Sequence, residues 1–165
     1  VRHASAKSLA LLGDDFWLEA FPLPTGPPSL KTLAASDRPE ILEVLVDLLT
    51  VQHAEDRRLA AEILGLKGAA NAATALRVVA ANDKDSAVRV HAVHTLGELR
   101  DAASVGAVMS AISDRSGGVR YAAVLAAGKL GAMEALPKLL ERLYDPGEKP
   151  QVRAAVAGML HQLQC

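Results

Sequence analysis

A repeat of 31 residues is the feature of this sequence that most restricts its fold. Val88-Arg89 begins one copy, and Val119-Arg120 begins the next copy 31 positions later. The same shift relates further residues of similar kind, from Gly97 and Gly128 to Asp114 and Asp145. A fixed period of about 20 to 50 residues is typical of proteins that stack one structural unit on the next. The sequence therefore predicts a solenoid.

Each copy contains two apolar stripes with the spacing of a helix. The stripe in the first half of the first copy consists of Val88, Ala92, Val93, Leu96 and Leu99. The stripe in the second half, at i, i+3, i+4 and i+7, consists of Val105, Val108, Met109 and Ile112. Arg100-Asp101 separates the two stripes, and Gly131 takes this place in the second copy. We expect two short antiparallel helices per copy, which must stack on neighbours to bury both stripes.

Small residues recur at two positions of the repeat. Ala92 matches Ala123, and Gly97 matches Gly128. A glycine inside a helix costs about 1 kcal/mol relative to alanine, so its recurrence suggests a compensating close contact. We expect these residues where the two helices of one hairpin cross.

These residues resemble HEAT-like repeats, above all the short class found in phycobilisome lyases and many bacterial proteins. The resemblance rests on Val-Arg, then Ala, then Gly-x-Leu, then a Leu-rich helix that ends in Asp, and it covers most of the chain. It implies an all-α, right-handed α-α superhelix of the armadillo-like type, with about four helical hairpins. It implies little about function, because such repeats serve many unrelated tasks.

The chain divides into an atypical beginning and a regular solenoid. Residues 1–28 are expected to form a degenerate first repeat or cap followed by a proline-rich loop at 22–28, since proline interrupts helices. Residues 29–165 are expected to form the repeats, continuous with the cap in one domain. The first residue is not Met, and the chain begins inside a repeat, so we expect it to be part of a larger chain.

Three of the five aromatic residues, Phe16, Trp17 and Phe21, lie close together in the atypical beginning. Terminal repeats are often atypical, which favours a bulky cap over the exposed end of the stack. The alternative is an exposed anchor for a partner.

Composition argues against several classes of protein. The chain has 18 Lys and Arg against 19 Asp and Glu, which gives no net charge for attracting nucleic acid. There is no apolar run of about 18 residues, so no membrane insertion is expected. The single cysteine, Cys165, excludes an internal disulfide framework and is compatible with a reducing compartment, and we expect a cytoplasmic protein.

The repeated arginines are expected to form a structural ladder. Arg89, Arg120 and Arg153 lie near helix starts, and an aspartate precedes each one: Asp83 or Asp85, Asp114 and Asp145. A guanidinium can bond both such a carboxylate and the loop carbonyls of the previous repeat. Arg2 is a further member of the series.

No motif indicates catalysis or a metal site. His91 and His94 lie three apart on one predicted helix, but only Glu98 accompanies them at helical spacing, which favours a chance surface cluster. No His is followed by Glu, as in the iron-dependent hydroxylases that contain HEAT-like repeats. We expect no cofactor and no metal, and a non-catalytic protein rather than an enzyme.

The resemblance implies that the second helix of each repeat lines the concave face. Its non-core positions then form the expected partner-binding surface: Asn71, Thr74, Arg77, Ser104, Ser110, Lys138, Glu141 and Arg142. Such a shallow, nearly neutral groove suits a helix or an extended peptide better than DNA. We therefore expect a scaffold or adaptor that binds another protein. The alternatives are a bilin-chromophore lyase or lyase subunit, suggested by the resemblance alone, and a DNA-binding protein like the HEAT-like glycosylases.

Overall fold

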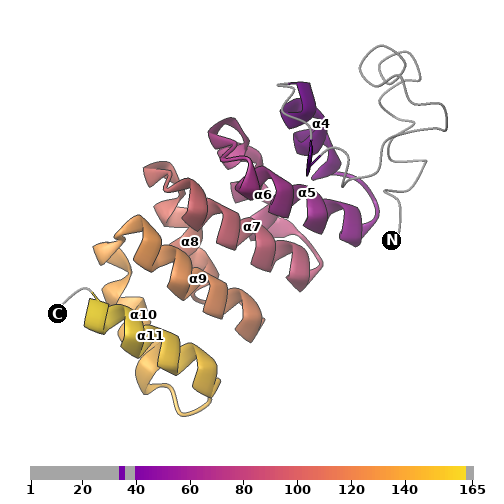
Figure 1. The fold of residues 1–165 in the computed structure, drawn as a ribbon. Coiled ribbons are helices and arrows are strands. Elements are labelled where there is room, and N and C mark those ends of the chain that lie inside the picture. The colour runs from indigo at the N-terminus through magenta and orange to yellow at the C-terminus, as the bar shows by residue number, and fades with distance from the viewer. Residues whose placement is uncertain (1–33, 36–39, 163–165) are drawn as a thin grey trace.

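A computed structural model describes residues 34–35 and 40–162, and all regular structure in these residues is helical (Figure 1). The expected cap and proline-rich loop, residues 1–28, lie outside the described residues, and so do Phe16, Trp17 and Phe21. The α-helices are α4 (Glu40–Leu48), α5 (Ala54–Leu66), α6 (Ala73–Asn82), α7 (Ser86–Leu99), α8 (Val105–Ala111), α9 (Gly117–Leu130), α10 (Leu136–Tyr144) and α11 (Pro150–Gln162). Short 3-10 helices precede three of them: η1 (Ala70–Ala72), η2 (Ala102–Ser104) and η3 (Met133–Ala135). Among the described helices, none combines the length and the apolar character needed to cross a membrane.

The helices form two layers. One layer contains α5, α7, α9 and α11, each packed against the next, and we call it the glycine layer after Gly65, Gly97 and Gly128 (Figure 1). The other layer contains α4, α6, α8 and α10, and we call it the leucine layer. Four hairpins result, because α4 packs against α5, α6 against α7, α8 against α9 and α10 against α11. This confirms the predicted all-α repeat fold.

The hairpins are paired differently from the sequence-based prediction. The prediction joined the helix at Val88 to the one that follows it, which would pair α7 with α8. In the structure α7 packs much more extensively against the preceding helix, α6. A repeat period gives the length of a unit but not its starting point, so the sequence pattern could not decide which neighbour completes the hairpin.

The recurring glycines also lie at a different contact from the one predicted. A Cβ added to Gly97 would lie 2.8 Å from both the Cα and the Cβ of Ala126, which belongs to α9. The close approach is therefore between successive helices of the glycine layer, rather than within one hairpin. Gly65 meets Thr95 in the same way, again across two neighbouring units.

The core lies between the two layers and consists of aliphatic side chains. Leu64 and Leu96 contribute from the glycine layer, while Leu76 and Leu139 contribute from the leucine layer, and all four are fully buried. These are positions of the predicted stripes or their counterparts. Because each unit supplies only a few large side chains, stability depends on contacts between neighbouring units.

Arg89, in the glycine layer, links its own unit to the next one through an ion pair. The Arg89 side chain is 3% exposed, and its Nε and Nη2 atoms lie 2.9 and 2.8 Å from the two carboxylate oxygens of Asp114. Its Nη1 also donates to the carbonyl oxygen of Asp83 at 2.9 Å. Burial alone would raise the pKa of Asp114, but hydrogen bonds from Arg89 and the Ser116 backbone lower it below the ordinary value.

Two further arginines repeat this arrangement. Arg57 pairs with Asp83 at 2.6 Å, and Arg120 pairs with Glu148 at 2.6 Å. Each also donates to backbone carbonyls of the loop that precedes its own helix, and Arg120 does so to Asp114 at 2.7 Å. The side chain of Glu148 is fully buried in this contact.

The predicted ladder is therefore wrong about which carboxylate pairs with each arginine. The sequence placed each carboxylate just before its arginine, but the preceding loop supplies carbonyls and the following loop supplies the carboxylate. Asp145 accordingly contacts Arg142 at 3.4 Å, while Arg120 takes Glu148 instead. Arg153 forms no ion pair with a described residue. Arg2 lies outside the described residues.

Candidate functional site on the glycine layer

The glycine layer forms one face of the stack, which we call the inner face. Its successive helices contact one another extensively, whereas contacts between successive helices of the leucine layer are sparse. We had expected the Leu-rich helices to line the concave side of the superhelix, and that expectation stays a prediction.

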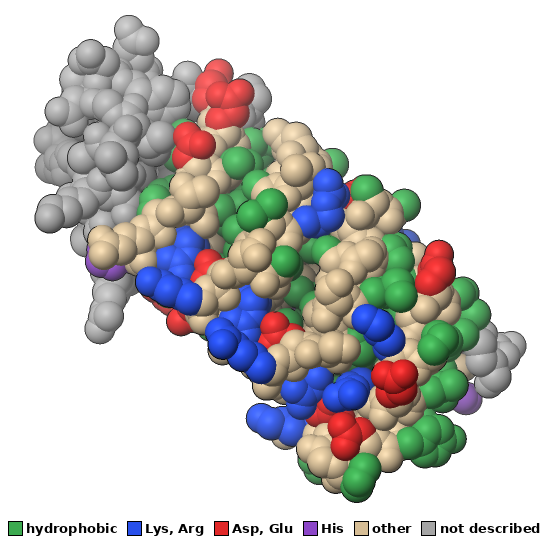
Figure 2. All heavy atoms as spheres, turned by 180° about the vertical axis from the view of Figure 1, so that it is seen from behind, with side chains coloured by type: hydrophobic (Ala, Val, Ile, Leu, Met, Phe, Trp, Pro, Cys, Tyr) green, Lys and Arg blue, Asp and Glu red, His purple; other side chains and the backbone are tan. Residues whose placement is uncertain are grey.

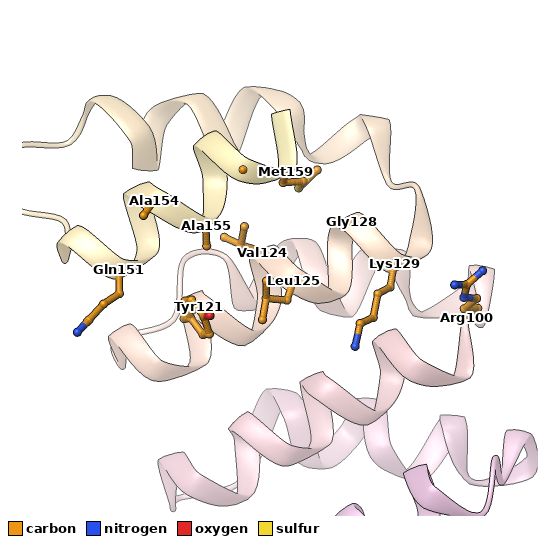
Figure 3. Close-up of a pocket in the computed structure, with 11 residues that line it drawn as sticks. Arg100, Tyr121, Val124, Leu125, Gly128, Lys129, Gln151, Ala154, Ala155 and Met159 are labelled. Carbon is orange, nitrogen blue, oxygen red and sulfur yellow. The ribbon is translucent and has the colours of Figure 1, made fainter. Parts of the chain in front are cut away.

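A hollow of about 780 Å³ lies between α9 and α11 on this face (Figure 3). Its α11 side consists largely of small residues, among them Ala154, Ala155 and Gly158. Tyr121 and Leu125 extend from α9 along the opposite side. The hollow exists because alanine and glycine leave space beside these bulkier side chains.

The polar residues of this hollow all carry hydrogen-bond donors. Arg100 and Lys129 lie at one end, and Gln151 lies at the other end, beyond Tyr121 (Figure 3). No acidic side chain is among the residues that line it. The hollow thus combines an apolar wall with a positively charged end.

A second hollow, of about 620 Å³, crosses α5, α7 and α9. Leu66 and Val90 are among its apolar residues, while Glu62 and Glu98 give it carboxylates. Leu66 is 80% exposed, which is unusual for a leucine in a helix that otherwise packs well. Unlike the first hollow, this one has an acidic character.

Tyr121 and Leu125 line both hollows, so the two form one groove along the inner face. We call it the inner groove. These two side chains are 42% and 38% exposed, although they are large and apolar. Exposed apolar residues gathered in a groove are typical of a surface that binds another molecule.

An ion pair marks the boundary between the acidic and the basic end of the inner groove. Lys129 bonds the carboxylate of Glu98, and His94 lies 3.3 Å from the same carboxylate. The hydrogen bond from Lys129 is the main reason why the pKa of Glu98 lies below its ordinary value. Both partners are on the surface, so the pair orients side chains more than it stabilises the fold.

His91 lies beside a second cluster of charges at the acidic end. Nη1 of Arg58 is 3.3 Å from Nε2 of His91 and 3.1 Å from a carboxylate oxygen of Glu62. Burial lowers the pKa of His91, and the positive charge of Arg58 lowers it further. The neutral imidazole can accept a hydrogen bond from Arg58, whereas the protonated ring cannot.

Neither His91 nor His94 belongs to a metal site in the described part of the chain. No group of three or more His, Cys, Asp or Glu side chains is arranged there to hold a metal ion. The two rings contact Arg58 and Glu98 instead.

The predicted binding residues lie on or beside the leucine layer, and none of them lines the inner groove. Three of them meet around Asp101: Arg77 pairs with it at 2.7 Å, Ser104 donates to it at 2.8 Å, and Thr74 accepts from Arg77 at 2.9 Å. This network joins α6 to η2. Seen from behind, the molecule shows apolar patches between acidic and basic side chains (Figure 2).

The other predicted residues do not form such a cluster. Lys138 lies 3.4 Å from the carbonyl oxygen of Met109, and Ser110 donates to the carbonyl of Gly106 within its own helix. Arg142 pairs with Asp145, whereas Asn71 and Glu141 are exposed. Whether any of these residues binds a partner stays a prediction.

Tyr121 and Leu125 were not among the residues predicted to bind a partner. A usable signal was present: Tyr121 occupies the position of Val90 in the previous unit, and Leu125 occupies the position of His94. Both are bulky apolar residues outside the predicted stripe, on a helix that was expected to face away from partners. The expected binding surface was confined to the Leu-rich helices, so these two residues were not among its members.

A family model described as HEAT repeats matches residues 42–107 and again residues 73–161. The comparison with curated proteins found no match. Among solved structures, the chain is similar to the complex of CpcE and CpcF of phycocyanin lyase from Nostoc sp. PCC7120, with 21% identity and a TM-score of 0.66. That match covers 87% of this chain and 68% of the other chain.

The chain is also similar to YibA of E. coli, with 22% identity and a TM-score of 0.69. This match covers 99% of the present chain and 65% of YibA, so the chain spans about two thirds of YibA's length. At these identities the solved structures show the fold alone. The two matches of the family model together span residues 42–161, which is more than half of the chain, and on this ground the chain belongs to the HEAT repeat family.

Proposed function

We propose that this chain is a non-catalytic interaction module that holds a helix or peptide of a partner protein in the inner groove. The observation that carries the proposal is the pair Tyr121 and Leu125, whose exposed apolar side chains connect two hollows. Aromatic and aliphatic anchors in a groove commonly supply most of the affinity of a protein interface.

The rigidity of the groove supports the same proposal. Neighbouring helices of the glycine layer are in direct contact at Gly97 and Ala126, and the buried Arg89–Asp114 pair fixes their loops. A partner that binds such a preformed surface loses little affinity to ordering of the module. An amphipathic helix is the expected partner segment, because its apolar side can follow Leu125 and Tyr121 while its polar side remains in water.

The charges of the groove favour a protein over DNA. Arg57, Arg89 and Arg120 are engaged in ion pairs of the ladder, so they cannot provide a stripe for phosphates. Glu62 and Glu98 bring negative charge into the groove itself. These charges therefore do not favour the DNA-binding alternative. The lyase alternative rests on resemblance and on the name of one neighbour, and no residue of the groove favours it.

The test compares the two layers in affinity capture from cells that express the tagged protein. Leu125→Asp is expected to remove the partners that wild-type protein captures, because it places a carboxylate on the apolar wall of both hollows. Reversal of the charges at Lys138, Glu141 and Arg142 tests the leucine layer, which is the competing site. Circular dichroism checks that both variants remain helical.

Two results would contradict the proposal. Captured partners that are retained by Leu125→Asp and lost with the charge reversals would move the binding site to the leucine layer. If both variants retain the captured partners, neither surface is the binding site.

A further inference from the structure

Arg100 occupies a backbone conformation that its neighbours give to glycine. It ends α7 with a φ of +49°, and no other described residue apart from glycine has a positive φ. The corresponding residues of the adjacent units are Gly68 and Gly131, with φ of +61° and +63°. A side chain makes this left-handed conformation unfavourable, so the turn itself does not explain an arginine here.

The Arg100 side chain forms no close polar contact that accounts for it either. It is exposed and forms no hydrogen bond or ion pair with a described residue, and its charge only contributes to the lowered pKa of Glu98. It lies at the end of the α9–α11 hollow, on the same side as Lys129 (Figure 3). An unfavourable backbone conformation that orients an unpaired charge toward a groove is a reason to look for function.

The surroundings of Arg100 favour one class of ligand. Lys129 is engaged by Glu98, so the guanidinium of Arg100 is the charge that remains available at this end. The same hollow is lined by the apolar Leu125 and Val124, and none of its lining residues is acidic. A guanidinium can bind a carboxylate through two parallel hydrogen bonds, which is stronger and more selective than a contact with a single charge.

We propose that Arg100 is the specificity residue of the inner groove and binds an aspartate or glutamate side chain of the partner. The partner segment would place this acidic residue next to the apolar residues that contact Tyr121 and Leu125. The inference rests on the proposed function and refines it, because it names the chemistry of the bound segment. It also gives the segment an orientation, since its acidic end would point away from Glu62.

The test begins with peptides selected from a random displayed library on the wild-type protein. Selected peptides are synthesised with a fluorescent label, and each Asp or Glu is replaced by Asn or Gln in a matched copy. Fluorescence anisotropy then gives their affinities for wild type, Arg100→Gly, Arg100→Gln and Leu125→Asp. Arg115→Ala is the control, because Arg115 is another exposed arginine and does not line the groove.

We expect the selected peptides to contain an acidic residue beside aromatic or aliphatic ones. Loss of one charge-assisted contact should weaken binding about tenfold, whether the change is made in the peptide or at Arg100. The two changes should not add, because they remove the same contact. Arg100→Gly should be at least as stable as wild type, since glycine accepts the left-handed conformation, so loss of binding cannot be attributed to unfolding.

The results separate the two proposals. Peptides that require Leu125 but bind Arg100→Gly as tightly as wild type would overturn the role of Arg100 and leave the inner groove in place. Peptides that bind Leu125→Asp as well as wild type would overturn the inner groove itself. A selection that yields no specific peptide would count against both.

Discussion

The two layers of this protein use similar residues in different ways. In the glycine layer, Gly97 allows α7 to approach the backbone of α9, and Arg89 is almost completely buried with its carboxylate. In the leucine layer, Gly106 has open space around it, and the Arg77–Asp101 pair is more than a quarter exposed. The same kinds of residue are therefore structural requirements on one side and surface features on the other.

This difference connects the stability of the stack with its binding surface. In the glycine layer, Tyr121 and Leu125 line two connected hollows. In the leucine layer, Val78 is an exposed apolar side chain, with 57% of its surface accessible. Matched substitutions in the two layers can test how much each layer contributes.

The largest difference in the free energy of unfolding is expected between substitutions in the Arg89–Asp114 and the Arg77–Asp101 ion pairs. Arg89→Gln leaves Asp114 and loop carbonyls without their donors in a buried place, which should lower the free energy of unfolding by about 3–5 kcal/mol. Arg77→Gln removes a partly exposed pair and should cost less than about 1 kcal/mol. Urea denaturation followed by circular dichroism measures both. Equal losses of stability in the two variants would mean that the burial of its ion pairs does not distinguish the glycine layer from the leucine layer.

The next contrast concerns the close approach of α7 and α9. Gly97→Ala places a methyl group 2.8 Å from the Cα atom of Ala126, so the two helices must separate. We expect a loss of about 1–3 kcal/mol, even though alanine is otherwise the better helix former. Thermal and urea denaturation check this value. A stabilised Gly97→Ala would show that the glycine layer is not closely packed there.

A smaller effect of opposite sign is expected in the leucine layer. A Cβ added to Gly106, in α8, meets nothing within 4 Å, and its backbone conformation suits any residue. Gly106→Ala should therefore raise the free energy of unfolding by about 0.4–1 kcal/mol, because it restricts the unfolded chain. The same denaturation experiment applies. A loss as large as that of Gly97→Ala would remove the distinction between the layers.

The fold could be predicted from the sequence because its signal is repeated. The stripes that contain Leu96 and Ile112 have helical spacing, and their recurrence after 31 residues indicates stacking. The ends of helices were predictable for a similar local reason, since Gly131 does adopt the left-handed conformation at the end of α9. These features depend on residues close together in the chain.

The pairing of helices and the groove could not be predicted, because they depend on contacts between units. The period does not say whether α7 completes a hairpin with α6 or with α8. The partner of Arg120 is Glu148, 28 positions later, where the sequence pattern pointed to a nearby aspartate. Tyr121 and Leu125 become a common wall only when α7, α9 and α11 are side by side.

The smallest contrast is expected in the dependence of stability on pH. Burial alone would raise the pKa of Asp83, but hydrogen bonds lower it, as they lower those of Glu148 and Asp101. A carboxyl whose folded pKa is lowered stabilises the protein above its unfolded pKa of about 4, and this stabilisation is lost as the pH falls through the folded value. Wild-type stability should therefore decline on acidification below about pH 4. Because Asp101 is on the surface of the leucine layer, Asp101→Asn should leave most of this decline unchanged in urea denaturation between neutral and acidic pH. If Asp101→Asn abolished the decline, the buried ladder of the glycine layer would not be the main source of acid sensitivity.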